Sequence, residues 1–184
     1  ALPISGSVFF FASMDQHNVT NVGDVPATYL VFNYQSGLTA SSPEEGVEKA
    51  TASGKLVGKL ASSIYDWEKL AFTKTEKGGR RQLMNSPTAT ISSLEGHVTT
   101  LNVGESPHAA HNHPDEELMV VKEGMLEATV DGVVTRGGPG SIFFYASNSM
   151  HGVKNVGATP ATYYVFRFVT DGTPKATAAP AKAE

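Results

Sequence analysis

Residues 104–124 read GESPHAAHNHPDEELMVVKEG, and this stretch decides how the rest of the chain is interpreted. His111 and His113 are separated by a single residue, so in an extended strand their imidazoles face the same side. Pro114 ends that strand, because proline cannot donate to a strand ladder. Glu117 then opens the apolar run ELMVV, and a short reversal would return its carboxylate to the two imidazoles.

A third histidine, His151, completes a candidate metal site. It lies on a later strand and reaches the other ligands only if the sheet closes on itself. Three imidazoles and one carboxylate suit a divalent transition metal, with positions left open for water or substrate. We therefore expect one such metal per chain, with copper, iron or manganese favoured and zinc or nickel as alternatives. The expected ligands are His111, His113, Glu117 and His151.

The spacing of these residues resembles the two sequence motifs of the cupin superfamily. The first motif is matched by Gly104, His111, His113, Glu117 and Gly124. The second is matched by Gly140, His151 and Asn155. Together the two motifs cover about residues 91–168 of the chain.

Three positions depart from the family pattern, and all of them lie in loops. Six residues rather than five separate Gly104 from His111, Ala146 replaces the usual proline, and Asn148 replaces the usual glycine. The resemblance implies a small antiparallel β-barrel or jelly roll with a mononuclear metal inside. Cupins include oxidases, dioxygenases, decarboxylases, isomerases, storage proteins and sugar-binding domains, so the fold alone does not give the function.

An internal repeat relates the two ends of the chain. Residues 6–32 and 140–166 are identical at 17 of 27 positions at an offset of 134, and each copy reads as strand, turn, strand. The second copy has an upstream half, residues 91–136, in which Asp131-Gly132 predicts a two-residue hairpin. The first copy is half a domain. Its His17 aligns with His151 but has no His-x-His partner, so we expect a vestigial or unsatisfied ligand.

These patterns predict an all-β protein with a short helical connector. We divide the chain into an N-terminal half-repeat, a connector, a complete domain and a disordered tail, covering residues 1–36, 37–90, 91–170 and 171–184. Ser42-Pro43-Glu44-Glu45 is typical of a helix start, and we expect the helix to end near Gly54. A second helical stretch is expected at residues 55–62, followed by Trp67 as a packing anchor.

Several other side chains are weaker candidates for a functional role. We interpret His108 as a loop residue at the barrel mouth, with an acid or base beside the metal as the alternative, and His97 as structural. Glu116 is expected to point away from Glu117. Arg167 is interpreted as a solvated strand end, with a clamp for an anionic substrate as the alternative. Four aromatic residues are expected in the core and are candidates to line the barrel: Phe143, Tyr145, Tyr163 and Phe166.

Composition excludes several classes of function. The net charge is −4 and the basic residues do not cluster, so we expect no nucleic acid partner. The chain has no cysteine, which excludes disulfides, thiol catalysis and cysteine-ligated zinc. No apolar run reaches the roughly 18 residues of a membrane span. The start at Ala1 without methionine is interpreted as a processed end, so we expect a secreted or periplasmic protein, with the cytoplasm as the alternative.

The predicted site favours a metal-dependent oxidoreductase that uses O2 or peroxide on a small organic or saccharide substrate. Glu117 would be a ligand and a possible catalytic base. Two alternatives stay open: a redox-neutral isomerase or decarboxylase, and a non-enzymatic module that binds metal or a small molecule.

The half-repeat predicts an interaction between chains. Exposed strands with unpaired backbone groups promote aggregation, so residues 4–34 must pair with something. They could join their own barrel, be removed or disordered, or exchange with a second copy. We expect the exchange, and therefore a homodimer.

Overall fold

The computed structural model describes residues 5–36 and 60–174. Within these residues the chain forms eleven strands and a single 3-10 turn, η1 (Trp67–Lys69). The strands are β1 (Val8–Phe10), β2 (Ser63–Tyr65), β3 (Thr73–Thr75), β4 (Gly78–Ser86), β5 (Ser93–Leu101), β6 (Glu116–Glu123), β7 (Leu126–Val130), β8 (Val133–Gly137), β9 (Ile142–Tyr145), β10 (His151–Asn155) and β11 (Ala161–Val169). No described helix is long and apolar enough to cross a membrane.

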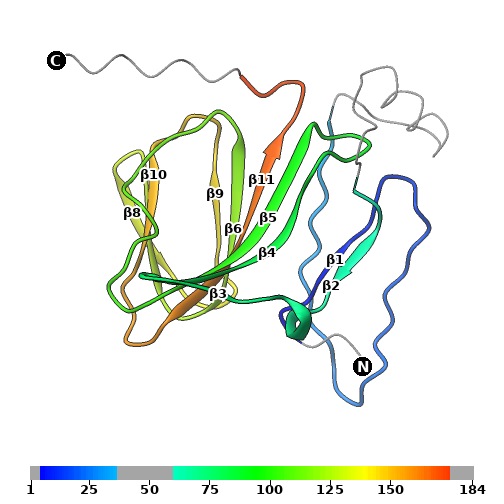
Figure 1. Ribbon diagram of the computed structural model, residues 1–184, viewed down its shortest axis with the longest axis horizontal. Helices are drawn as coiled ribbons and strands as arrows, with labels where there is room; N and C mark the ends of the chain where they lie inside the picture. Colours follow the sequence, from blue (N-terminus) through cyan, green and yellow to red (C-terminus); the bar gives the residue numbers. More distant parts are fainter. Residues whose placement is uncertain (1–4, 37–59, 175–184) are drawn as a thin grey trace.

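Two antiparallel sheets form the main body of the protein (Figure 1). The larger has the order β3-β4-β5-β11-β6-β9 and the smaller has the order β10-β7-β8. The turn between β7 and β8 is the predicted hairpin, with positive φ angles of 47° at Asp131 and 85° at Gly132. The predicted all-β antiparallel barrel or jelly roll is confirmed.

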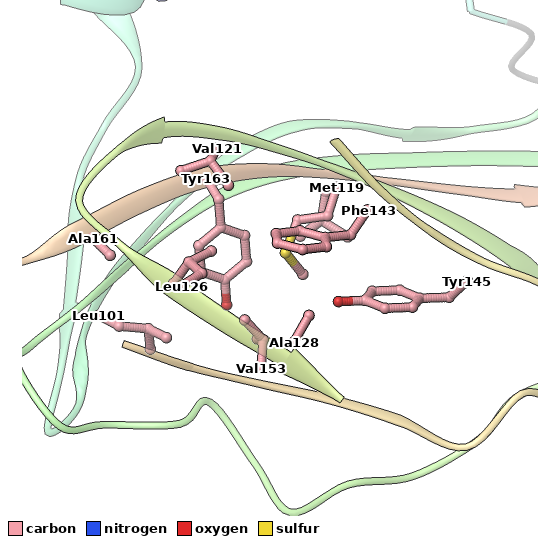
Figure 2. Packing of buried hydrophobic residues seen from close by; sticks show 11 residues of the cluster. Leu101, Met119, Val121, Leu126, Ala128, Phe143, Tyr145, Val153, Ala161 and Tyr163 are labelled. Atoms are coloured by element: carbon pink, nitrogen blue, oxygen red, sulfur yellow. The ribbon is translucent and has the colours of Figure 1, made fainter. Parts of the chain in front are cut away.

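Strand β11 is central to the larger sheet, because it pairs with β5 along one edge and β6 along the other. Its side chains alternate between the two faces, as the period of a strand requires. Tyr163 and Val165 face the smaller sheet, where Figure 2 shows Tyr163 packed among side chains from both sheets. Tyr164 and Phe168 belong to a second apolar cluster on the opposite face. The larger sheet therefore needs apolar cover on both sides.

The outer face of the larger sheet is covered by the N-terminal part of the chain. Strands β1 and β2 pair with each other and lie beyond β4 and β5 from the smaller sheet (Figure 1). Trp67 packs against Tyr164 with ring centroids 6.4 Å apart, in keeping with its expected role as a packing anchor. The Tyr164 hydroxyl donates to the Gly6 carbonyl oxygen at 2.6 Å.

The expected connector contains more strand than the sequence suggested. Strands β3 and β4 come from its C-terminal part and belong to the larger sheet, with β4 paired to β5 along its length. The helix expected from residue 42 lies outside the described residues, as do residues 55–59 of the second. Residues 60–62, which complete that second stretch, are not helical. In the expected tail, residues 170–173 form a hydrogen-bonded turn, and residues from 175 onward lie outside the description.

Asn155 joins the end of β5 to the loop between β10 and β11. Its side chain is fully buried, and its amide nitrogen donates to the carbonyl oxygens of Leu101, Asn102 and Thr159 at 3.1, 3.2 and 2.9 Å. Its carbonyl oxygen accepts from the Gly157 backbone nitrogen at 2.9 Å. One side chain thus satisfies four backbone polar groups in these two segments.

We predict that Asn155→Ala lowers the free energy of unfolding by about 2–4 kcal/mol, because it leaves several buried groups without partners. Chemical denaturation measures the change. Asn21 is the matched control, since it is the same residue of the other repeat and is exposed. We expect Asn21→Ala to change stability by less than about 1 kcal/mol. Equal losses in the two variants would contradict this account.

Candidate metal centre

The backbone brings His111 and His151 together. The His111 nitrogen donates to the His151 carbonyl oxygen at 2.9 Å, and the His151 nitrogen donates to the His111 carbonyl oxygen at 2.8 Å. This isolated antiparallel bridge attaches the loop before β6 to the start of β10. A third backbone bond runs from Asn148 to the His113 carbonyl oxygen at 2.8 Å.

Three imidazole rings converge at this point. Ring centroids lie 5.2 Å apart for His111 and His113, 4.7 Å for His111 and His151, and 4.8 Å for His113 and His151. One potential ligand atom on each ring lies within 4.8 Å of the others. The structure therefore brings together the three histidines that the sequence singled out.

Backbone carbonyls hold two of these rings in a ligand-ready orientation. Nδ1 of His113 donates to the Asp115 carbonyl oxygen at 2.8 Å, and Nδ1 of His151 donates to the Ser149 carbonyl oxygen at 2.9 Å. A bond of this kind fixes the tautomer and leaves the Nε2 lone pair free. Nε2 of His113, Nε2 of His151 and Nδ1 of His111 are all buried without a hydrogen-bond partner. These orphaned nitrogens are the donors that a divalent metal requires, so the residues present fit a metal ion.

Glu117, the second residue of β6, lies beside the histidine cluster. Glu116 is exposed and Glu117 is buried, so their side chains lie on opposite faces. A Glu117 carboxylate oxygen lies 3.3 Å from Nε2 of His113, although the three-histidine group does not include it. Glu117 is therefore placed to act as a fourth ligand or as a base next to the metal.

The protonation state of His111 suits metal binding. Burial, together with the charges of neighbouring groups, lowers the pKa of His111 to about 4. Burial contributes most, followed by His108, His151, His113 and Arg167. A neutral imidazole keeps the lone pair that coordinates a metal. His111 is thus ready to bind a cation at neutral pH.

The cluster opens onto a cavity of about 590 Å³ inside the barrel. Leu101, Met119, Val153 and Val165 contribute an apolar lining, while His111, Glu117 and His151 contribute the polar wall. Lys77, Arg80 and Arg167 also line the cavity. This volume is typical of a site for a small organic molecule.

Arg167 corrects one interpretation made from the sequence. Its side chain is 38% exposed, but it also pairs with the buried Asp115, its Nε and Nη2 donating to the two carboxylate oxygens at 2.7 and 3.0 Å. An Asp115 oxygen lies 3.3 Å from Nδ1 of His113. Burial raises the pKa of Asp115, but the hydrogen bonds and charge of Arg167 outweigh it and hold that pKa below its usual value. Arg167 and Asp115 thus form a charged pair behind His113.

The alternation of side chains along β11 could have predicted that Arg167 lies on the inward face of this strand. Arg167 follows Tyr163 and Val165 at intervals of two residues on β11, and both of those side chains face the interior. Asp115 carried no comparable signal in the sequence, because its role depends on a partner 52 residues away.

Tyr145 places a buried hydroxyl near the histidines, and this hydroxyl is not one of the expected metal ligands. Its ring stacks on His151 with centroids 4.3 Å apart, and its hydroxyl is buried without a hydrogen-bond partner. Figure 2 shows the hydroxyl pointing into the interior of the cluster. Burial raises the pKa of Tyr145, and the Glu117 carboxylate raises it further, so the hydroxyl remains a proton donor. From the sequence, Tyr145 was expected in the core and was a candidate to line the barrel.

Two further histidines, His97 and His108, also line the cavity. His108 is exposed and meets the His111 ring edge-on at 4.2 Å, as expected for a loop residue at the mouth. His97 lines the cavity and its Nδ1 lies 2.9 Å from a Glu95 carboxylate oxygen. Neither ring belongs to the three-histidine group.

Residues 97–173 match the sequence model of the family described as the cupin domain. This part of the chain is a cupin domain. The matched region contains His111, His113, Glu117 and His151, so the candidate centre lies within the cupin domain. Among the curated proteins, none matches the chain.

Solved structures similar to this cupin come from diverse organisms. An RmlC-like cupin from Shewanella frigidimarina is 19% identical, with a TM-score of 0.47 over 58% of this chain and 89% of its own. KdgF from a Halomonas species is 20% identical, with a TM-score of 0.48 over 57% of this chain and 92% of its own. A predicted oxalate decarboxylase from Thermotoga maritima is 15% identical, with a TM-score of 0.46 over 55% and 95%. The reaction must therefore be inferred from the residues of this chain.

We predict that His111→Ala, His113→Ala and His151→Ala each remove most of the bound metal, because each deletes one orphaned nitrogen. The measurement is metal content after equilibrium dialysis, by elemental analysis. His97→Ala is the control and should keep the wild-type content, since its ring lies outside the group. Equal metal content in all four variants would place the metal elsewhere.

Proposed function

We propose that this chain is a metal-dependent oxidoreductase that uses O2 or peroxide on a small organic or saccharide substrate. The observation that carries the proposal is the set of three orphaned imidazole nitrogens beside a cavity of about 590 Å³. Copper, iron or manganese held by His111, His113 and His151 would bind and polarise substrate or oxygen. Copper is favoured if the protein is exported, because divalent affinity peaks at copper.

Charges at the cavity favour a substrate that carries a negative charge or many hydroxyl groups. Lys77, Arg80 and Arg167 line the cavity, and two carboxylates, Glu76 and Glu117, line it as well. Asp115 occupies Nε and Nη2 of Arg167, which leaves Nη1 to bind a substrate oxygen. Arg167 thus combines its structural pairing with the anion clamp considered from the sequence.

Two further side chains suit proton transfer and orientation. Glu117 lies next to His113 and could accept a proton from a substrate hydroxyl. The Tyr145 hydroxyl lines the same cavity and has no protein partner, so a bound substrate or oxygen ligand would satisfy it. We assign Glu117 as the candidate base and Tyr145 as the candidate hydrogen-bond donor.

The basic lining also supports a second candidate function, the redox-neutral decarboxylation or isomerisation of a carboxylic acid or sugar. An anionic substrate held by Arg167 fits either reaction class. The two candidates differ in whether a co-substrate is consumed. Oxygen or peroxide disappears in the first, and neither changes in the second.

We predict that protein loaded with copper, iron or manganese consumes O2 or peroxide with a panel of small carboxylic acids, phenols and sugars. Activity should fall to background in His111→Ala, whereas His17→Ala, at an exposed histidine outside the cavity lining, should retain it. An oxygen electrode and a peroxide assay measure turnover, and carbon dioxide release is followed in parallel. Product formation without oxygen or peroxide consumption would replace the oxidoreductase with the redox-neutral enzyme. Full activity after metal removal would contradict both.

We predict that Tyr145→Phe lowers kcat by on the order of 100-fold while metal content stays at the wild-type value. The substitution keeps the ring that stacks on His151 and removes the unpartnered hydroxyl. Tyr163→Phe is the matched control, because its hydroxyl also lies at the cavity but already bonds Thr99. Steady-state kinetics on both variants test the assignment. A Tyr145→Phe enzyme as active as the control would remove Tyr145 from the reaction.

A further inference from the structure

A histidine–carboxylate pair lies on strand β5, outside the three-histidine group. Glu95 and His97 are two residues apart on this strand, so their side chains share one face of the larger sheet. Nδ1 of His97 lies 2.9 and 3.0 Å from the two carboxylate oxygens of Glu95. His97 also lines the cavity, which puts the shared face toward the barrel interior.

Glu95 is held in place by donors from the neighbouring strand β4. Nη2 of Arg80 donates to Oε1 of Glu95 at 2.7 Å, and Nε2 of Gln82 donates to the same oxygen at 3.3 Å. Burial raises the pKa of Glu95, but the hydrogen bond and charge of His97, together with Gln82 and Arg80, outweigh it and hold that pKa below its usual value. Glu95 is therefore an ionised carboxylate at neutral pH.

The carboxylate fixes the tautomer of His97. An ionised carboxylate accepts hydrogen bonds and donates none, so the proton of a neutral His97 ring sits on Nδ1. Nε2 then presents a lone pair, and no group in the described part of the chain donates a hydrogen bond to it. This nitrogen is not one of the fully buried polar atoms, so it is open to the cavity. Nε2 of His97 is thus an acceptor available to a bound molecule.

The register of the larger sheet places His97 near Arg167. Arg167 pairs with Glu95 on one side of β11 and with Glu117 on the other. His97 is the next inward residue of β5 and pairs with Val165. Diagonal neighbours of this kind lie roughly 7–8 Å apart. A molecule of a few carbon atoms can therefore contact Arg167 and His97 together.

Arg167 and His97 offer complementary groups at this point. Nη1 of Arg167 and Nε2 of His97 have no hydrogen-bond partner among residues 5–36 and 60–174. The neighbouring inward hydroxyl groups of Thr99 and Tyr163 already bond each other. The positively charged donor suits a carboxylate, and the neutral acceptor suits a hydroxyl group. One molecule that carries both groups satisfies both nitrogens.

We propose that Nε2 of His97 accepts a hydrogen bond from a hydroxyl group of the substrate while Nη1 of Arg167 binds its carboxylate, so the substrate is a small hydroxy acid. The inference rests on the proposed function, because it narrows the substrate class of the same cavity. Glu95 is a positioning residue that keeps the proton on Nδ1. His97 determines specificity, since an acid without the hydroxyl leaves Nε2 without a partner in the cavity.

The test compares hydroxy acids with matched acids that lack the hydroxyl: glycolate with acetate, lactate with propionate, and malate with succinate. NMR titration of the metal-free full chain gives the dissociation constants, and the absence of metal prevents chelation of the hydroxy acid. We expect at least one pair in which the hydroxy acid binds about 10-fold more tightly. The Nε2 resonance of His97 should shift with that hydroxy acid and not with its matched acid.

Variants separate the roles of the two groups. His97→Phe keeps a ring and removes the acceptor, so the preference should fall to about onefold. His97→Gln places an amide oxygen near the position of Nε2 and should restore part of the preference. Glu95→Gln allows either tautomer and should lower the preference to about threefold. Arg167→Lys should weaken both acids by a similar factor and leave the preference in place.

His108→Ala is the matched control, because His108 is the other histidine that lines the cavity outside the three-histidine group. This variant should keep the wild-type preference. Circular dichroism of each variant confirms that the fold is retained, and His97→Gln supplies the second measurement if His97→Phe does not fold.

Three results would overturn the proposal: equal affinities within every pair, a preference that survives in His97→Phe, or no binding of any acid. A preference that appears only after zinc is added would assign the hydroxyl group to the metal instead and would also overturn it. The titration needs neither metal nor turnover. An enzyme that consumes no O2 or peroxide would therefore contradict the oxidoreductase and leave the hydroxyl contact at His97 standing.

Discussion

The two backbone hydrogen bonds between His111 and His151 are the contact on which the candidate site depends. They attach the loop before β6 to the first residue of β10, and so close the barrel at the point where three imidazoles meet. Without this bridge the His111 and His113 pair would lie on a loop, and His151 would lie on a separate sheet. Carbonyls at Asp115 and Ser149 then orient two of the rings, and the Tyr145 ring stacks on His151, so backbone hydrogen bonds and side-chain packing together set the ligand directions.

The chemistry of the cavity follows from what lines each wall. Apolar residues of both sheets line part of the interior, while Arg167 and Tyr145 provide polar groups close to the histidines. Burial keeps His111 neutral and Tyr145 protonated, which suits one as a ligand and the other as a donor. Low polarity strengthens each of these interactions relative to water. A small site of this kind can bind a metal, orient a ligand and transfer a proton.

A second constraint acts on the other face of the larger sheet. Strand β11 places aromatic side chains outward as well as inward, so the outer face must be covered. Residues of the N-terminal half-repeat supply that cover with Phe32 and Tyr34. Covering the sheet in this way leaves Tyr29 and Val31 of the half-repeat exposed, because alternate residues of an extended segment face opposite sides. The outer face of the larger sheet is thus covered, but the opposite face of the half-repeat is exposed.

The sequence by itself determined the all-β class, the hairpin at Asp131-Gly132 and the histidines that converge, because strand period, turn chemistry and motif spacing are local properties. It also identified the repeat, since identity at matched positions needs no coordinates. Strands β3 and β4 were not predicted. Their mutual pairing is a local hairpin with Thr75 opposite Gly78, whereas the pairing of β4 with β5 joins residues up to 23 positions apart. Only the tertiary structure decided that Arg167 points inward onto Asp115, that Tyr145 presents an unpartnered hydroxyl, and that His17 is oriented like His151. Strand phase could have placed Arg167 on the inward face of β11, but its pairing with Asp115 joins residues 52 positions apart and cannot be read from the order of residues along the chain.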